Sequence, residues 1–137
     1  MTYEGPVKPI ASHEEEIAHL RAQVEAKERE LAGMKQGRPR EAIVRERLTH
    51  HLQTPAETVL APHMQMHAEE AHEIALNLDP ESDDDTMEEL RQVMEARGIH
   101  NAFAVLAKLQ NPHLEDDFHR FLIAYISTGL PPRGLNE

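Results

Sequence analysis

Apolar residues recur at three- and four-residue steps from Asp83 to Thr128, where the pattern is the most regular in the chain. Such steps place the apolar side chains on one face of a helix. Ser82 and the aspartates after it supply an acceptor and negative charge where a helix start presents unpaired N–H groups. Gly98 follows the last apolar turn and favours a helix end near Arg97. These residues predict the first of three amphipathic helices.

The second and third helices are separated by Asn111 and Pro112. Pro112 suits the first turn of a helix because it lacks an N–H group that would remain unpaired there. Gly129 and the prolines after it are predicted to end the third helix. Because the connections are short, the helices are expected to lie against one another. Their largest apolar side chains should share one core, which comprises Phe103, Leu106, Phe118 and Phe121.

The outer face of the third helix carries polar side chains beside this predicted core. Asp117 and His119 flank Phe118 in the sequence, so a helix turns them away from the phenylalanine side. Polar residues on such a wetter face contribute little to stability and are available to a partner. We therefore predict Asp117 and His119 as interaction residues.

Residues 12–36 show a different pattern, which predicts an earlier and separate helix. Ser12 and Glu15 have the spacing of a capping box at a helix start. Lys27 stands at one of the apolar heptad positions and weakens the pattern. Three interpretations remain: a coiled coil with a protein partner or a second copy in a dimer, packing onto the chain's own core, or a lone helix. The heptad face, the predicted pairing surface, consists of Ile17, Leu20, Val24, Leu31 and Met34.

The middle of the chain reads as several short helices. Glycines and a proline make residues 33–39 a predicted hinge. A helix is expected to start near Pro39, a short one to begin with Thr54 as its N-cap, and a third to cover residues 63–78. No alternating pattern indicates a strand. The prediction is an all-α short-helix bundle, in this order: a disordered tail (1–11), the separate heptad helix (12–36), a helical module (37–128) and a flexible C-terminal tail (129–137).

Metal chemistry is suggested only by residues 63–73, in a chain with ten histidines. His63 and His67 are four residues apart and would share one side of a helix, while Glu69 and His72 have a three-residue spacing known from carboxylate-bridged metal centres. The two pairs would point to different sides, whereas a structural site needs four converging ligands. A polar helix face with surface histidines is favoured, and metal binding is the alternative hypothesis.

Composition narrows the classes of function. The net charge of −11 disfavours binding to nucleic acid. The absence of cysteine excludes disulfides and thiolate metal sites, and no apolar run approaches the ~20 residues of a membrane span. The first residues lack the features of a secretory signal, so a cytoplasmic location is expected. Motifs for phosphate binding and for nucleophilic catalysis are missing. We expect no catalytic residues and no cofactor.

The segment GIHNAFAVLAKLQNPHLEDDFHRFLIAYI, residues 98–126, resembles a helical segment of uncharacterised proteins of candidate-phylum bacteria. In that family a GI.NA..V..K..NPHLEDDFHRFL..YI pattern lies near components that look like type IV secretion or conjugative-transfer machinery. The resemblance implies an accessory or docking role at the cytoplasmic face of a membrane assembly, and the lack of a long apolar run predicts that the chain does not insert into the membrane itself. The sequence thus predicts a non-enzymatic interaction module that acts through the heptad face and an apolar groove on the C-terminal helices.

Overall fold

All the regular elements that the computed structural model describes are helices. The description covers residues 9–78 and 83–129, with the backbone alone for residues 83 and 84. One isolated bridge joins Ile10 to Leu60. The predicted all-α class is confirmed. In chain order the elements are α1 (His13–Gly33), α2 (Arg40–Gln53), α3 (Ala56–Val59), the 3₁₀ helix η1 (Pro62–Met64), α4 (Ala68–Leu76), α5 (Asp83–Arg97), α6 (Ile99–Leu109) and α7 (Pro112–Thr128).

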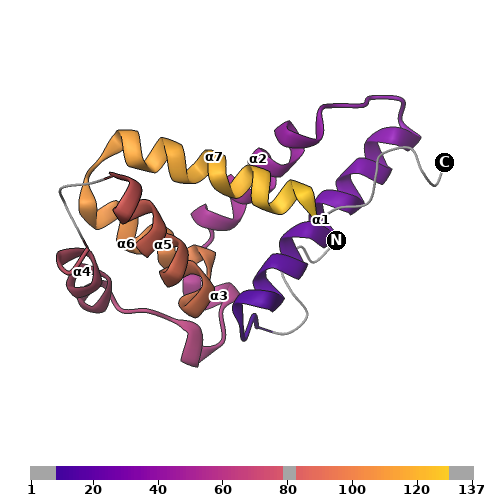
Figure 1. Cartoon of the computed structure of the whole chain (residues 1–137). Coiled ribbons are helices and arrows are strands. Elements are labelled where there is room, and N and C mark those ends of the chain that lie inside the picture. The colour runs from indigo at the N-terminus through magenta and orange to yellow at the C-terminus, as the bar shows by residue number, and fades with distance from the viewer. Residues whose placement is uncertain (1–8, 79–82, 130–137) are drawn as a thin grey trace.

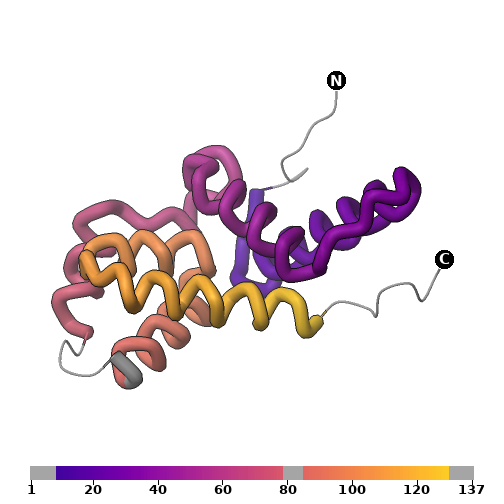
Figure 2. The backbone as a smooth tube through the Cα atoms, turned by 90° about the horizontal axis from the view of Figure 1, so that it is seen from above, coloured from indigo at the N-terminus to yellow at the C-terminus, as the bar shows by residue number. Residues whose placement is uncertain are grey.

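The helix α7 lies across α2 and reaches α1 with its C-terminal end, while α5 and α6 pack beside each other under α7 (Figure 1). α4 covers α6 on the side away from α1 (Figure 1). The view from above shows the antiparallel α1–α2 hairpin projecting from this group of helices (Figure 2). No helix in the described ranges combines the length and the apolar character that a membrane crossing requires.

The helix predicted over residues 12–36 is present as α1, but the prediction that it is separate from the rest of the chain is wrong. Ile17, Leu20, Val24 and Leu31 are buried in one core with residues of α2, α5, α6 and α7. Only Met34 of the heptad face is well exposed, with 52% of its surface accessible. The self-packing interpretation therefore describes this chain, because α6 and α7 leave apolar surface that α1 and α2 cover.

Lys27 shows how α1 accommodates a charge in the apolar pattern. Its side chain remains 31% exposed and its ammonium group lies 3.4 Å from the Glu30 carboxylate. The charged end thus reaches solvent, as is common for lysine at the edge of an apolar face.

The helix ends follow the local signals closely where those signals are strong. Ser12 Oγ accepts a hydrogen bond from the Glu15 N–H group at 3.2 Å, and the Glu15 carboxylate accepts one from the Ala11 N–H group at 3.0 Å. In a usual capping box the glutamate accepts from the N–H group of the N-cap residue, which is Ser12 here. In this chain Glu15 accepts from the preceding residue, Ala11. Asn111 Oδ1 accepts from the Leu114 N–H group at 3.1 Å and caps α7, with Pro112 in the first turn. The expected cap at Ser82 lies outside the described residues.

The predicted aromatic core is confirmed. Phe118 is fully buried, and Phe103 and Phe121 pack against the same cluster. The ring of Phe118 lies 5.4 Å from that of Phe103 and 5.9 Å from that of Phe121, between ring centres. Leu106 is buried in this cluster too.

The short helix predicted after Thr54 is present as α3, but its predicted N-cap and the single helix over residues 63–78 are wrong. Thr54 ends α2 instead of starting a helix, because its hydroxyl donates to the His50 carbonyl at 2.8 Å. The helix expected over residues 63–78 is divided, with η1 before residues 65–67 and α4 after them. Met64 is buried against Val59 and Leu60, and these contacts outweigh the helical preference of the segment.

The N-terminal tail is also shorter than predicted. Ile10 is buried beside Val59 and Leu60, its N–H group donates to the Val59 carbonyl at 2.8 Å, and its carbonyl accepts from the Ala61 N–H group at 2.7 Å. Two backbone hydrogen bonds and a buried side chain thus hold Ile10, three residues before the start of α1, against the α3–η1 segment.

Candidate functional site

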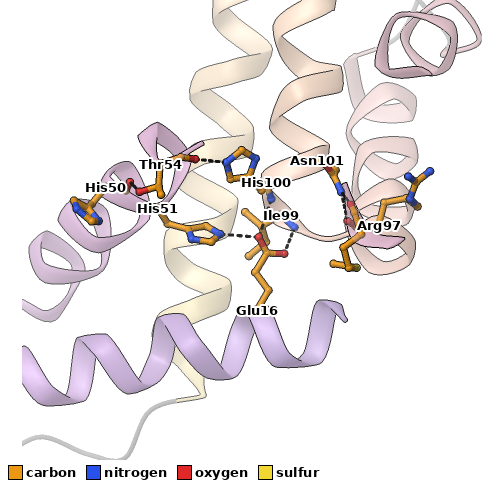
Figure 3. A network of polar contacts seen from close by, with 9 residues as sticks. Glu16, His50, His51, Thr54, Arg97, Ile99, His100 and Asn101 are labelled. Carbon is orange, nitrogen blue, oxygen red and sulfur yellow. Dashed lines mark hydrogen bonds and ion pairs between the residues drawn. The ribbon is translucent and has the colours of Figure 1, made fainter. Parts of the chain in front are cut away.

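Glu16 of α1 is a carboxylate with no exposed surface, and it binds two other helices (Figure 3). Its oxygens accept hydrogen bonds from the N–H groups of Ile99, at 2.5 Å, and His100, at 2.9 Å, at the start of α6. The His51 Nε2 atom of α2 lies 2.7 Å from Oε2. One side chain therefore joins α1, α2 and α6.

The location of this carboxylate has a clear electrostatic cause. The first N–H groups of a helix have no acceptor within the helix, and the helix dipole makes that end positive. In α6 the N-cap residue is Gly98, which has no side chain to accept from those groups. Glu16 supplies the missing acceptor from a helix more than eighty residues earlier in the chain.

Gly98 is required at this position for two reasons. Its φ of +94° is a backbone conformation that other residues rarely adopt. A Cβ atom built on Gly98 would also lie 2.5 Å from Glu16 Oε1, which is too close for any side chain. The glycine thus ends α5, as the sequence predicts, and also leaves the space that the carboxylate occupies.

Glu16 is held in its ionised form. Burial alone would raise the pKa of Glu16, but the hydrogen bond and charge of His51, with the N–H groups of His100 and Ile99, lower that pKa below the usual value. An ionised carboxylate only accepts hydrogen bonds, so the Nε2 atom of His51 carries the proton between the two groups.

Two further imidazoles lie next to His51. The His100 ring stands edge-on to it at 5.5 Å between ring centres, and its Nε2 atom lies 2.7 Å from the Thr54 carbonyl oxygen (Figure 3). The His19 ring lies 6.2 Å from the His51 ring. Burial and the nearby charges of His51 and Arg47 lower the pKa of His19, although Glu16 acts in the opposite direction.

A paired glutamate and histidine are suited to proton transfer in general. Here the pair is closed to a substrate, because Glu16 has 0% and His51 only 3% of its surface exposed. Each carboxylate oxygen also accepts from a backbone N–H group that belongs to the fold. The arrangement is thus suited to hold helices together, and we do not assign it to catalysis.

Arg21 is a second polar anchor on α1. It binds the C-terminal end of α7, whereas Glu16 binds the N-terminal end of α6. Its Nε atom donates to the Ile126 carbonyl at 3.1 Å and its Nη2 atom to the Tyr125 carbonyl at 2.8 Å. The guanidinium also lies 5.7 Å from the centre of the Tyr125 ring. A cation is favourable at the negative C-terminal end of a helix. α1 therefore presents an acid to the start of α6 and a base to the end of α7.

Asn101 provides a third polar contact inside the core. Its Nδ2 atom donates to the carbonyls of Met64, at 2.5 Å, and Arg97, at 2.8 Å (Figure 3). This buried amide joins α6 to η1 and to the end of α5. It also helps to explain why η1 stops at Met64 instead of continuing as a long helix.

The predicted metal candidates are not brought together. Residues 65–67 are not helical, so the four-residue spacing of His63 and His67 does not place them on a shared helix face. His63 Nε2 lies 2.7 Å from the Ala11 carbonyl oxygen, while His67 is the N-cap of α4. Glu69 and His72 lie on α4 and are exposed. Over residues 9–78 and 83–129, no group of three or more histidines and acids is close enough to hold a metal ion.

The predicted interaction residues of α7 lie on its outer side. Asp117 is partly exposed and lies 3.4 Å from His113 and 3.6 Å from Arg120. His119 is half-buried, with its ring edge-on to Phe103 at 6.0 Å and its Nδ1 atom 3.5 Å from Arg45 of α2. Burial and the charge of Arg45 lower the pKa of His119. Both residues are more exposed than Phe118, which agrees with the predicted faces.

Sequence reasoning missed the polar anchors on α1 and α2. Glu16 precedes Leu20 and Val24 by four and eight residues, so it continues their buried stripe. His51 continues the stripe of Val44 and Leu48 in the same way. An ionisable residue in line with an apolar stripe indicates a buried charge, and a buried charge needs a buried partner. This pattern could have identified both residues from the sequence.

Comparisons with family models, with curated proteins and with solved structures found no match to this chain.

Proposed function

We propose that this protein is a non-enzymatic helical docking module that binds a protein partner through the outer face of α7 and the adjoining part of α2. We call this surface the α2–α7 face. It comprises Arg45, Asp116, Asp117, His119 and Arg120.

The main support is the contrast between the two groups of charges in the molecule. Glu16 and His51 bind each other inside the fold and have almost no accessible surface. On α7, Asp116 and Arg120 form an ion pair at 2.5 Å while about two thirds of each side chain remains exposed. Exposed pairs of this kind contribute only ~0–1 kcal/mol to stability, so exchanging them for a partner's charges costs little.

The backbone under the α2–α7 face is held in place. Phe118 has no exposed surface and lies between residues that belong to the face, and Asn111 caps the start of the same helix. Charges on a rigid helix are preorganised, which favours specific and rapid association with a complementary surface. Both signs of charge are present, so the expected partner surface is also mixed.

The resemblance of residues 98–126 to proteins near type IV secretion-like components includes this stretch of α7. We therefore propose that the partner is a component of such an assembly, with this chain as an accessory part at its cytoplasmic side. That context rests on the resemblance alone.

A photo-reactive amino acid placed at position 116 in the native cells tests the proposal. We expect cross-linking to one discrete protein, and no such product from position 73, where Glu73 is an exposed residue of α4. Asp117→Lys should reduce the product by about tenfold, since it reverses one charge of the face. Glu73→Lys is the matched control. Equal products at positions 116 and 73, or none at either, would refute a docking role for this face.

A further inference from the structure

The surroundings of Glu16 contain more groups of positive or potentially positive charge than one carboxylate can balance. α1 contributes His19 beside Glu16 itself, α2 contributes Arg47 and His51, and α6 contributes His100. These groups come from three helices, of which α1 and α2 are consecutive and α6 lies far away in the sequence.

The other helices that pack on α1 do not add an acid to this cluster in the described contacts. α7 meets α1 through Tyr125, whose carbonyl accepts from Arg21. At the end of α5, the guanidinium of Arg97 is paired with Glu70 of α4 at 2.5 Å. The electrostatic balance at the cluster therefore depends on Glu16 against the imidazoles and Arg47.

We propose that Glu16, His19, His51, His100 and Arg47 form a pH-sensitive latch, which holds α1 on α2 and α6 near neutral pH and loosens α1 in mildly acidic solution. This inference is independent of the docking role proposed above. It concerns how the fold responds to protons, whatever the protein binds.

His19 is the group through which acid acts on the latch. Its ring is half-buried and lies 6.2 Å from the His51 ring, between ring centres. A proton on His19 places a further positive charge beside the His51 ring and near Arg47, in a site where water screens the repulsion only in part. Attraction to Glu16 offsets this only incompletely, since the pKa of His19 is lowered overall by burial and by His51 and Arg47.

The sign of the pH effect follows from this direction. A histidine whose pKa is lower in the folded protein binds its proton more readily when the chain is unfolded. The contribution of His19 to the free energy of unfolding is therefore complete above the ordinary pKa of histidine. It is lost as the pH falls from that value through the lower folded-state pKa. Glu16 remains ionised in this range, since its own pKa is lowered.

Loosening α1 would expose surface that is buried in the closed fold. Its inner face carries Ile17, Leu20 and Val24, all buried against the core. Opening of the latch would uncover this heptad face and the N–H groups of Ile99 and His100 together. Exchange of those two N–H groups therefore reports on the latch directly.

The test uses the full chain at pH 7.5 and pH 5.5. Amide exchange by NMR, corrected for the intrinsic rate at each pH, should show a loss of protection of about tenfold at Ile99 and His100 in acid. Protection at Leu122, in the middle of α7, should change much less. Thermal unfolding should show a fall in Tm of several degrees for the unaltered protein, with less than half of that fall in His19→Gln. His72→Gln, an exposed histidine of α4, should retain the whole fall.

Either of two results would overturn the latch. One is that Ile99, His100 and Leu122 lose protection in parallel, which indicates global unfolding. The other is that His19→Gln loses as many degrees as the unaltered protein. If His19→Gln does not fold, the exchange measurement on the unaltered chain decides alone.

Discussion

Glu16→Gln is the most direct perturbation of the contact that joins α1, α2 and α6. The substitution keeps the size of the side chain but replaces one carboxylate oxygen with an NH₂ group. Glu16 now accepts from three donors, the N–H groups of Ile99 and His100 and the His51 ring. The amide can accept through one oxygen only, so at least one buried donor must face another donor.

The magnitude can be worked out from those contacts. An unsatisfied buried donor costs about 1–3 kcal/mol. Loss of the negative charge at the start of α6 adds about 0.5–2 kcal/mol in a buried geometry. We expect Glu16→Gln to lower the free energy of unfolding by roughly 2–4 kcal/mol, a large part of the ~5–15 kcal/mol typical of a domain. In a chain of this size the Tm should fall by roughly 6–12 °C.

Urea unfolding followed by circular dichroism at pH 7.5 measures this difference. Glu14→Gln, at an exposed position of the same helical turn, is the matched control and should cost less than about 1 kcal/mol. The pH dependence is a second check. Because the pKa of Glu16 is lowered, its contribution is complete above the ordinary glutamate pKa and is lost as the pH falls through the lower folded-state value. The difference in the free energy of unfolding between the unaltered protein and Glu16→Gln should therefore disappear only in strong acid. A difference below about 0.5 kcal/mol at pH 7.5 would mean that the carboxylate does not hold the helices together.

Three further substitutions test neighbouring parts of the structure by the same unfolding measurement. Gly98→Ala should lower the free energy of unfolding by about 2–4 kcal/mol, because Gly98 has a positive φ and lies close to the Glu16 carboxylate. Gly37→Ala, with open space around it, is the control and should be neutral or slightly stabilising. Equal effects of the two substitutions would disprove the close approach. Phe118→Ala should cost ~3–5 kcal/mol and His119→Ala less than about 1 kcal/mol, and the reverse order would mean that the faces of α7 are misassigned. His67→Ala and a chelator should each leave the Tm of untagged protein within a degree or two, whereas about one tightly bound metal ion per chain would restore the metal hypothesis.

The sequence by itself determined most of the helix ends, because they depend on contacts between near neighbours. Ser12 accepts from an N–H group three residues away, and Asn111 does the same at the start of α7. Gly98 ends α5 through its own backbone preference. The three-helix pattern of residues 83–128 and the aromatic core between α6 and α7 followed from these signals and from the apolar period.

Tertiary structure decided what covers each apolar face. The stripe of Ile17, Leu20 and Val24 has the same period whether a second chain or the rest of this chain lies against it, so the sequence left both arrangements open. The break after Met64 was equally hidden, because it depends on contacts with Ile10 and on the amide of Asn101, far away along the chain.

The contacts of the polar anchors also depend on residues that are far apart in the sequence. Glu16 meets His51 and the N–H group of Ile99, at separations of 35 and 83 residues. No local rule pairs residues so far apart, and a buried carboxylate is tolerable only when the folded chain brings such donors to it. The sequence thus specified where helices begin and end, while the packing of α1 against α2 and α6 turned an unremarkable glutamate into the residue that joins them.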